Sequence, residues 1–140
     1  MNFLPLEGIG VACYGLGMED FDWVTAREKC SPGSVFELLR LQVKEDVETR
    51  NKSIKEERDA FRFNQNEKLF SVVLPSEPLR YGVTFSLKGE KIIVERKNKP
   101  FLEATLTLND EGECRLKVNG QEREFWQVRR MALEDLFFVP

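Results

Sequence analysis

The chain has 140 residues, a formal net charge of −3 and no histidine. This length fits one domain, residues 1–140, with enough buried surface for a hydrophobic core, and the aromatic content of 11% is too high for a disordered chain. No segment approaches the ~20 apolar residues that a membrane-spanning helix needs. Because the apolar start of the chain has no basic residue before Arg27, it lacks the positive end of a secretory signal, and we expect a cytoplasmic protein without membrane contacts.

The three cysteines are Cys13, Cys30 and Cys114, and no two of them are close in the sequence. Neither a disulfide framework nor a zinc site is expected from this spacing, so we predict three structural thiols. Cys114 alternates with Leu116 and Val118, which predicts a small buried hydrophobic side chain. Cys13 lies in a glycine-rich stretch and is the one thiol for which we consider exposure.

The first predicted helix covers residues 19–29. Before it, four of the nine glycines lie between residues 8 and 17, which indicates loops or a kinked strand. Asp20 or Asp22 is suited to cap the helix, and the basic residues near Lys29 suit its C-terminal end. The two carboxylates also form an Asp-x-Asp pattern that could hold a divalent cation, but capping is the expected role and no metal site is predicted.

Residues 35–50 show the strongest helical pattern of the chain. Phe36, Leu39, Val43 and Val47 are three or four positions apart, which places them on one face of a helix. The many Glu, Lys and Arg residues among them argue against the alternative reading as a strand.

The boundaries of this helix carry their own signals. Ser31 or Ser34 can cap its start, and Pro32 is tolerated in a first turn. Asn51 suits its end. Residues 52–59 are almost wholly polar, so they are either a fraying continuation of the helix or a solvated loop.

From residue 60 onward the hydrophobic period changes to two, which predicts β-strands. The expected strands cover residues 61–63, 69–74, 83–87, 91–95, 102–108, 114–118 and, as a last candidate, 122–128. Tight turns are predicted at Gly89 and at Asn119-Gly120, and Asn98-Lys99-Pro100 marks another break. Residues 129–138 have a helical pattern.

These elements predict an α+β fold. Short connections keep successive strands adjacent and antiparallel, and a sheet with one apolar face must cover that face. We expect an antiparallel β-meander of about five to seven strands, packed on the helix of residues 35–50 and followed by a short C-terminal helix. The alternative is a small closed β-barrel with flanking helices.

Basic residues gather in the middle of the predicted meander. Residues 61–100 contain eight basic and four acidic residues, although the whole chain is acidic. Arg96, Lys97 and Lys99 form a cluster at a connection between strands. Because nucleic-acid-binding domains usually present a strongly basic face, we expect no nucleic-acid partner. The cluster remains a candidate contact for another kind of partner.

The absence of histidine removes the commonest general base, the commonest metal ligand and the usual partner of a catalytic nucleophile. The glycines fit neither a dinucleotide-binding fingerprint nor a phosphate-binding loop. We therefore predict no catalytic residues and no cofactor. An enzyme that works through carboxylates, lysine or tyrosine is the third-ranked alternative.

Two non-enzymatic functions fit the sequence better. The first is a protein-interaction domain, such as an adaptor, chaperone-like or regulatory subunit, with a homodimer as one form. The second is binding of a small apolar ligand in a cavity under the meander, lined by Phe61, Phe63, Phe70, Phe85 and Trp126. Exposed aromatic and basic side chains mark binding surfaces, so the candidate contacts are Trp23, Trp126, Arg96, Lys97, Lys99, Arg129 and Arg130.

Overall fold

The computed structural model describes residues 20–78 and 80–138, which form a seven-stranded antiparallel sheet and three α-helices. The helices are α2 (Trp23–Lys29), α3 (Pro32–Asn51) and α4 (Phe125–Phe137), and a short 3-10 helix, η1, covers Glu57–Asp59. The strands are β2 (Arg62–Gln65), β3 (Leu69–Val73), β4 (Gly82–Lys88), β5 (Lys91–Arg96), β6 (Lys99–Leu108), β7 (Cys114–Val118) and β8 (Gln121–Arg123). The predicted α+β fold is confirmed. The glycine-rich residues 8–17, with Cys13, lie outside the described residues.

Each of the first two helices begins after one of the two capping residues that were considered for it, although α2 starts at Trp23 and not at residue 19. The Asp22 carboxylate accepts hydrogen bonds from the Thr25 amide at 3.1 Å and from the Thr25 hydroxyl at 2.7 Å. Ser31 caps α3 in the same way by accepting from the Ser34 amide, and Pro32 occupies the first turn. Because a proline there loses no helical hydrogen bond, α3 starts three residues before the predicted boundary.

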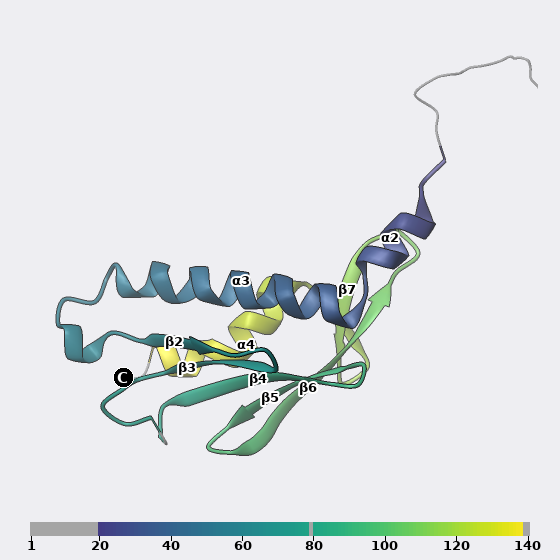
Figure 1. Cartoon of the computed structure of the whole chain (residues 1–140). Helices are drawn as coiled ribbons and strands as arrows, with labels where there is room; N and C mark the ends of the chain where they lie inside the picture. The colour runs from purple at the N-terminus through teal and green to yellow at the C-terminus, as the bar shows by residue number, and fades with distance from the viewer. Residues whose placement is uncertain (1–19, 79, 139–140) are drawn as a thin grey trace, which may run out of the picture.

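The predicted apolar face of α3 is the face that packs on the sheet. Phe36, Leu39, Val43 and Val47 are all buried. Figure 1 shows α3 lying along one side of the sheet with α4 on the same side, and both helices contact the strands. The core therefore fills the space between one face of the sheet and two helices.

The strands follow one another across the sheet in sequence order, which confirms the meander. Phe70, Phe85, Val94 and Leu102 are in register on four successive strands and are all buried, so they form one apolar row across the sheet. Among the strands that the structure describes, the sheet is open, with β2 and β8 at its two edges. The alternative of a closed barrel is therefore wrong. Two helices already cover the apolar face, so the sheet does not need to close on itself.

The boundary between the last strand and the last helix differs from the prediction. Strand β8 ends at Arg123, and α4 begins at Phe125 rather than at residue 129. Glu124 and Gln127 form a reciprocal capping box, in which the Gln127 side chain accepts from the Glu124 amide at 2.8 Å. This cap starts the helix early, and Val128 is then buried on its inner face.

The prediction of three unpaired thiols is also wrong, because Cys30 and Cys114 form a disulfide bond. Cys30 follows α2, and Cys114 is the first residue of β7, where it is only partly buried. Figure 1 shows α2 beyond one end of the sheet, beside the β6–β7 hairpin. A separation of 84 residues carries no local signal, so only the packing of α2 beside this hairpin brings the two sulfur atoms together.

The loop between β5 and β6 is shorter than predicted. Lys97 and Asn98 both have positive φ angles, of 52° and 62°, as two-residue hairpin turns of the I′ type require. Lys99 and Pro100 belong to β6 and not to the break. The register between the two strands shifts at Val94 and Glu95, where a β-bulge interrupts the ladder.

Candidate functional site

An open groove runs between the outer faces of α3 and α4 and has a volume of about 460 Å³. Each helix contributes residues that are three or four positions apart and therefore share one face. The lining residues are Asp46, Thr49 and Arg50 from α3, Ser53 just after its C-cap, and Trp126, Arg129, Arg130, Leu133, Glu134, Phe137 and Phe138 from α4 and its C-cap. We call this feature the α3–α4 groove.

The groove combines a buried apolar floor with exposed aromatic side chains. Leu133 and Phe137 are buried in the core. By contrast, Trp126 is 48% exposed and Phe138 is 64% exposed. Large aromatic side chains usually bury most of their surface, so two of them left open in one groove indicate a contact surface.

Arg129 fixes the two helices to each other. Its Nε donates to the Asp46 carboxylate at 2.7 Å, and one of its terminal nitrogens donates to the Gln42 side chain at 3.0 Å. The Arg129 and Asp46 side chains are both largely shielded from solvent. A partly buried, hydrogen-bonded ion pair of this kind holds a defined geometry, so Arg129 acts on the position of the groove walls.

Arg50 closes the C-terminal end of α4. Its Nε donates to the backbone carbonyl of Phe137 at 2.9 Å, and its guanidinium lies 4.7 Å from the centre of the Phe138 ring. The last carbonyl groups of a helix lack intrahelical partners, and a cation there is favourable. The same side chain therefore supports the exposed aromatic ring and adds positive charge to the groove.

Arg130 is the most accessible cation of the groove. Its side chain is 63% exposed and its Nε lies 3.1 Å from a carboxylate oxygen of Glu134, one helical turn later. Exposed pairs of this spacing are weak, about 0.3–0.5 kcal/mol. Arg130 can therefore exchange Glu134 for another carboxylate at little cost.

A second groove, of about 390 Å³, lies on another side of the end of α4. Arg96 and Lys97 contribute to its lining, together with Arg80, Asp135 and Phe138. The Arg96 guanidinium donates to the Asp135 carboxylate and to the Met131 carbonyl, both at 3.3 Å, and it lies 3.7 Å from the centre of the Phe101 ring. Arg96 thus joins the β5–β6 hairpin to α4 through both of its terminal nitrogens.

The structure brings some of the sequence-predicted contacts together and separates others. Trp126, Arg129 and Arg130 meet in the α3–α4 groove. Trp23 is 64% exposed on α2, outside this groove, and Lys99 is exposed at the start of β6.

The sequence reasoning missed Asp46 and Arg50 in the groove. Their spacing of four residues shows that they share a face of α3, but nothing local to them shows that this face meets α4.

The rings that were expected to line a ligand cavity pack against one another. Phe70 stacks on Phe85 with ring centroids 4.7 Å apart and also contacts Phe36 and Phe63. Phe61 packs on Phe137. Trp126 lies apart from these rings, in the α3–α4 groove. In the α3–α4 groove an apolar ligand would instead meet the exposed rings of Trp126 and Phe138.

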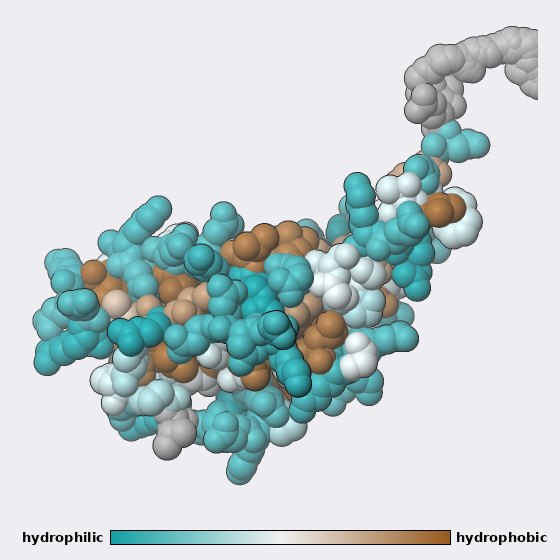
Figure 2. All heavy atoms as spheres, viewed as in Figure 1, coloured by the Kyte–Doolittle hydropathy of each residue, from teal (hydrophilic) through white to brown (hydrophobic). Residues whose placement is uncertain are grey.

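Other apolar side chains are exposed elsewhere. Figure 2 shows hydrophobic surface over the outer side of α3, where Leu38 and Leu41 are exposed. Phe21, Trp23 and Val24 are exposed at and just before α2.

Among residues 20–78 and 80–138, no group of three His, Cys, Asp or Glu side chains could hold a metal ion. In comparisons with known proteins, no family model, no curated protein and no solved structure matches this chain. The residues of the groove are therefore the basis of the proposed function.

Proposed function

We propose that this chain is a non-enzymatic protein-interaction domain, of adaptor, chaperone-like or regulatory type. In this proposal the α3–α4 groove binds a short peptide segment with a large apolar side chain next to a carboxylate. The observation that carries it is the exposure of Trp126 and Phe138 beside three arginines, Arg50, Arg129 and Arg130.

The apolar side chain and the carboxylate of the expected ligand each match residues of the groove. Trp and Arg are the residue types that most often dominate the energy of protein interfaces. Burial of apolar surface contributes roughly 25 cal/mol per Å², so covering the open faces of Trp126 and Phe138 favours an apolar anchor. The lining holds three guanidinium groups but only two carboxylates, those of Asp46 and Glu134, so an acidic partner is complementary.

Selection from a displayed peptide library on the intact chain tests this proposal. We expect the selected sequences to share an apolar residue next to an acidic one. Trp126→Ala should weaken the binding of the selected peptide by about tenfold or more, as measured by fluorescence anisotropy. Trp23→Ala is the matched control, because Trp23 is similarly exposed but lies outside the groove.

Two outcomes would count against the peptide-binding groove. One is a consensus without an acidic residue, or no consensus at all. The other is a selected peptide that binds equally well to wild type and to Trp126→Ala. If an apolar dye binds one-to-one and raises the melting temperature, and if Trp126→Ala abolishes this effect, the small-ligand alternative replaces the peptide proposal.

Location is a separate part of the proposal. Within the described residues, no helix is long and apolar enough to cross a membrane. The cytoplasm expected from the sequence remains a prediction, and the Cys30–Cys114 bond argues against it because the cytosol keeps most thiols reduced. Alkylation of the protein at the moment of cell lysis, followed by mass spectrometry, distinguishes the oxidised from the reduced form.

A further inference from the structure

Two segments of strand β6 are each paired on one side only. Lys99–Ala104 pairs with β5, and Thr105–Leu108 pairs with β7. The unpaired side of Thr105–Leu108 lies next to Arg27 of α2, Cys30 and Pro32. Among the described strands, none pairs with the remaining side of residues 99–103, which we call the β6 free edge.

Space for another strand exists beside the β6 free edge. A notch of about 530 Å³ separates Pro100–Glu103 from Lys117–Gly120, at the β7–β8 turn, with Met131 of α4 among its lining residues. Phe101, at the centre of the edge, is 44% exposed. Backbone groups along an open strand edge are a template for pairing with another chain, and an exposed aromatic ring there makes pairing more favourable.

The sequence of the edge is complementary to itself. It reads Lys99-Pro100-Phe101-Leu102-Glu103, with a cation at one end and an anion at the other. When two such segments pair antiparallel about Phe101, Lys99 of each copy faces Glu103 of the other, and the two Phe101 rings face each other. A two-fold interface requires this kind of self-complementarity.

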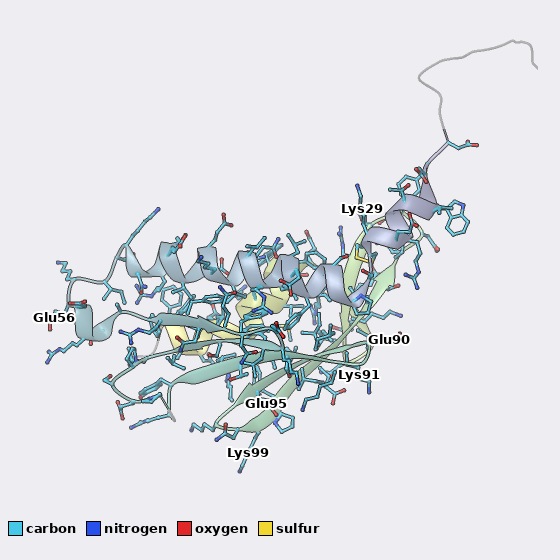
Figure 3. The ribbon with its side chains drawn as sticks, in the orientation of Figure 1. Lys29, Glu56, Glu90, Lys91, Glu95 and Lys99 are labelled. Atoms are coloured by element: carbon cyan, nitrogen blue, oxygen red, sulfur yellow. A yellow bond between two sulfur atoms is a disulfide. The ribbon has the colours of Figure 1, made fainter. Side chains whose placement is uncertain are left out.

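The ion pair that Glu103 forms within its own chain is weak and would compete little with a second copy. Glu103 lies 3.5 Å from Lys91, and both side chains are more than half exposed. Figure 3 shows Lys99 near the end of the β5–β6 hairpin, away from the helices.

We propose that two copies of this chain form a dimer through the β6 free edge, with residues 99–103 of one copy antiparallel to residues 99–103 of the other. Pro100 lies beside the β-bulge and has no backbone N–H, so the pairing has to use the backbone groups of the other residues of the segment. The dimer uses no residue of the α3–α4 groove, since no residue lines both the groove and the notch. The peptide-binding proposal therefore stands or falls independently.

Sedimentation velocity of the intact chain from about 1 to about 500 µM tests the dimer. Lys99→Glu and Glu103→Lys each place like charges opposite one another in the dimer, so each should weaken dimerisation by about tenfold. The double variant Lys99→Glu/Glu103→Lys restores both interchain pairs with reversed polarity and should recover most of the wild-type affinity. It does not restore the Lys91–Glu103 pair, so recovery must come from the second copy.

Leu41→Lys is the matched control, because Leu41 is an exposed apolar residue on α3 and should leave dimerisation unchanged. Thermal unfolding of each variant shows that the monomer still folds. Wild type that is monomeric at every concentration overturns the proposal. The proposal is also overturned if neither single charge reversal weakens dimerisation, or if the double variant does not recover the wild-type affinity.

Discussion

The side-chain amide of Asn51 forms two hydrogen bonds with the backbone of Phe61. Its Nδ2 donates to the Phe61 carbonyl and the Phe61 amide donates to its Oδ1, each at 2.9 Å. Asn51 is the last residue of α3, and Phe61 is the buried residue before β2. The side chain thus imitates a strand partner and joins the end of the helix to the start of the sheet.

Replacing Asn51 by alanine should destabilise the chain by about 1–3 kcal/mol, because it leaves two partly buried backbone groups without partners. Asn51→Asp keeps the acceptor but places a carboxylate against the Phe61 carbonyl and at the C-terminal end of α3, so it should destabilise the chain as well. Urea unfolding at neutral pH measures both. If Asn51→Ala unfolds at the wild-type urea midpoint, this pair of hydrogen bonds does not stabilise the fold.

The Cys30–Cys114 bond should contribute about 2–4 kcal/mol to the free energy of unfolding, because it restricts an unfolded loop of more than eighty residues. A reductant should therefore lower the stability of wild type. The double variant Cys30→Ser/Cys114→Ser should be as unstable as the reduced protein and should not respond to reductant. Equal stability of oxidised and reduced wild type would show that the bond contributes nothing.

Gly120 follows Asn119 in the β7–β8 turn and has a φ angle of +79°. A Cβ atom there would meet no neighbour, so the cost of Gly120→Ala comes from the backbone alone, about 1 kcal/mol. Gly33, in the first turn of α3, is the control: its substitution by alanine also meets no neighbour and should stabilise the helix slightly. Chemical denaturation that ranks the two variants in the opposite order would contradict this account.

Hydrogen bonds from the hydroxyl and the amide of Thr25 lower the pKa of Asp22 below its ordinary value of 3.8. Because the folded pKa is depressed, the capping contribution is fully present above the unfolded pKa and is lost as the pH falls through the folded pKa. The Thr25 amide resonance should follow this titration in NMR spectra between about pH 2 and pH 6.

Thr25→Ala removes the stronger of these hydrogen bonds and should move the pKa of Asp22 upward. An unchanged titration in this variant would assign the shift to another cause. The variant also tests whether the cap defines the start of α2, since helix fraying at residues 23–25 should increase as the pKa returns to its ordinary value.

Local pattern was enough to predict α3 and most strands, because their apolar residues repeat at the helical or the strand period over many positions. It failed at residues 122–128, where an alternating pattern and a capping box compete for the same stretch. The capping box prevailed because α4 buries Val128, Ala132 and Leu136 against the sheet.

The candidate site was only partly readable for the same reason. Trp23 and Trp126 are equivalent as isolated residues, and the sequence offers no ground for choosing between them. Only Trp126 lies beside the cations of the α3–α4 groove. The Arg129–Asp46 pair spans 83 residues, so no local window contains both partners.

The sequence by itself determined the type and order of the elements, the apolar face of each, and the adjacency of strands joined by short turns. These properties depend on side-chain periodicity and on turn residues that act over a few positions. Only the tertiary structure decided that the sheet stays open, that Cys30 meets Cys114 and that α3 and α4 form a groove. Each of these depends on how distant faces pack, and packing is set by the whole core together.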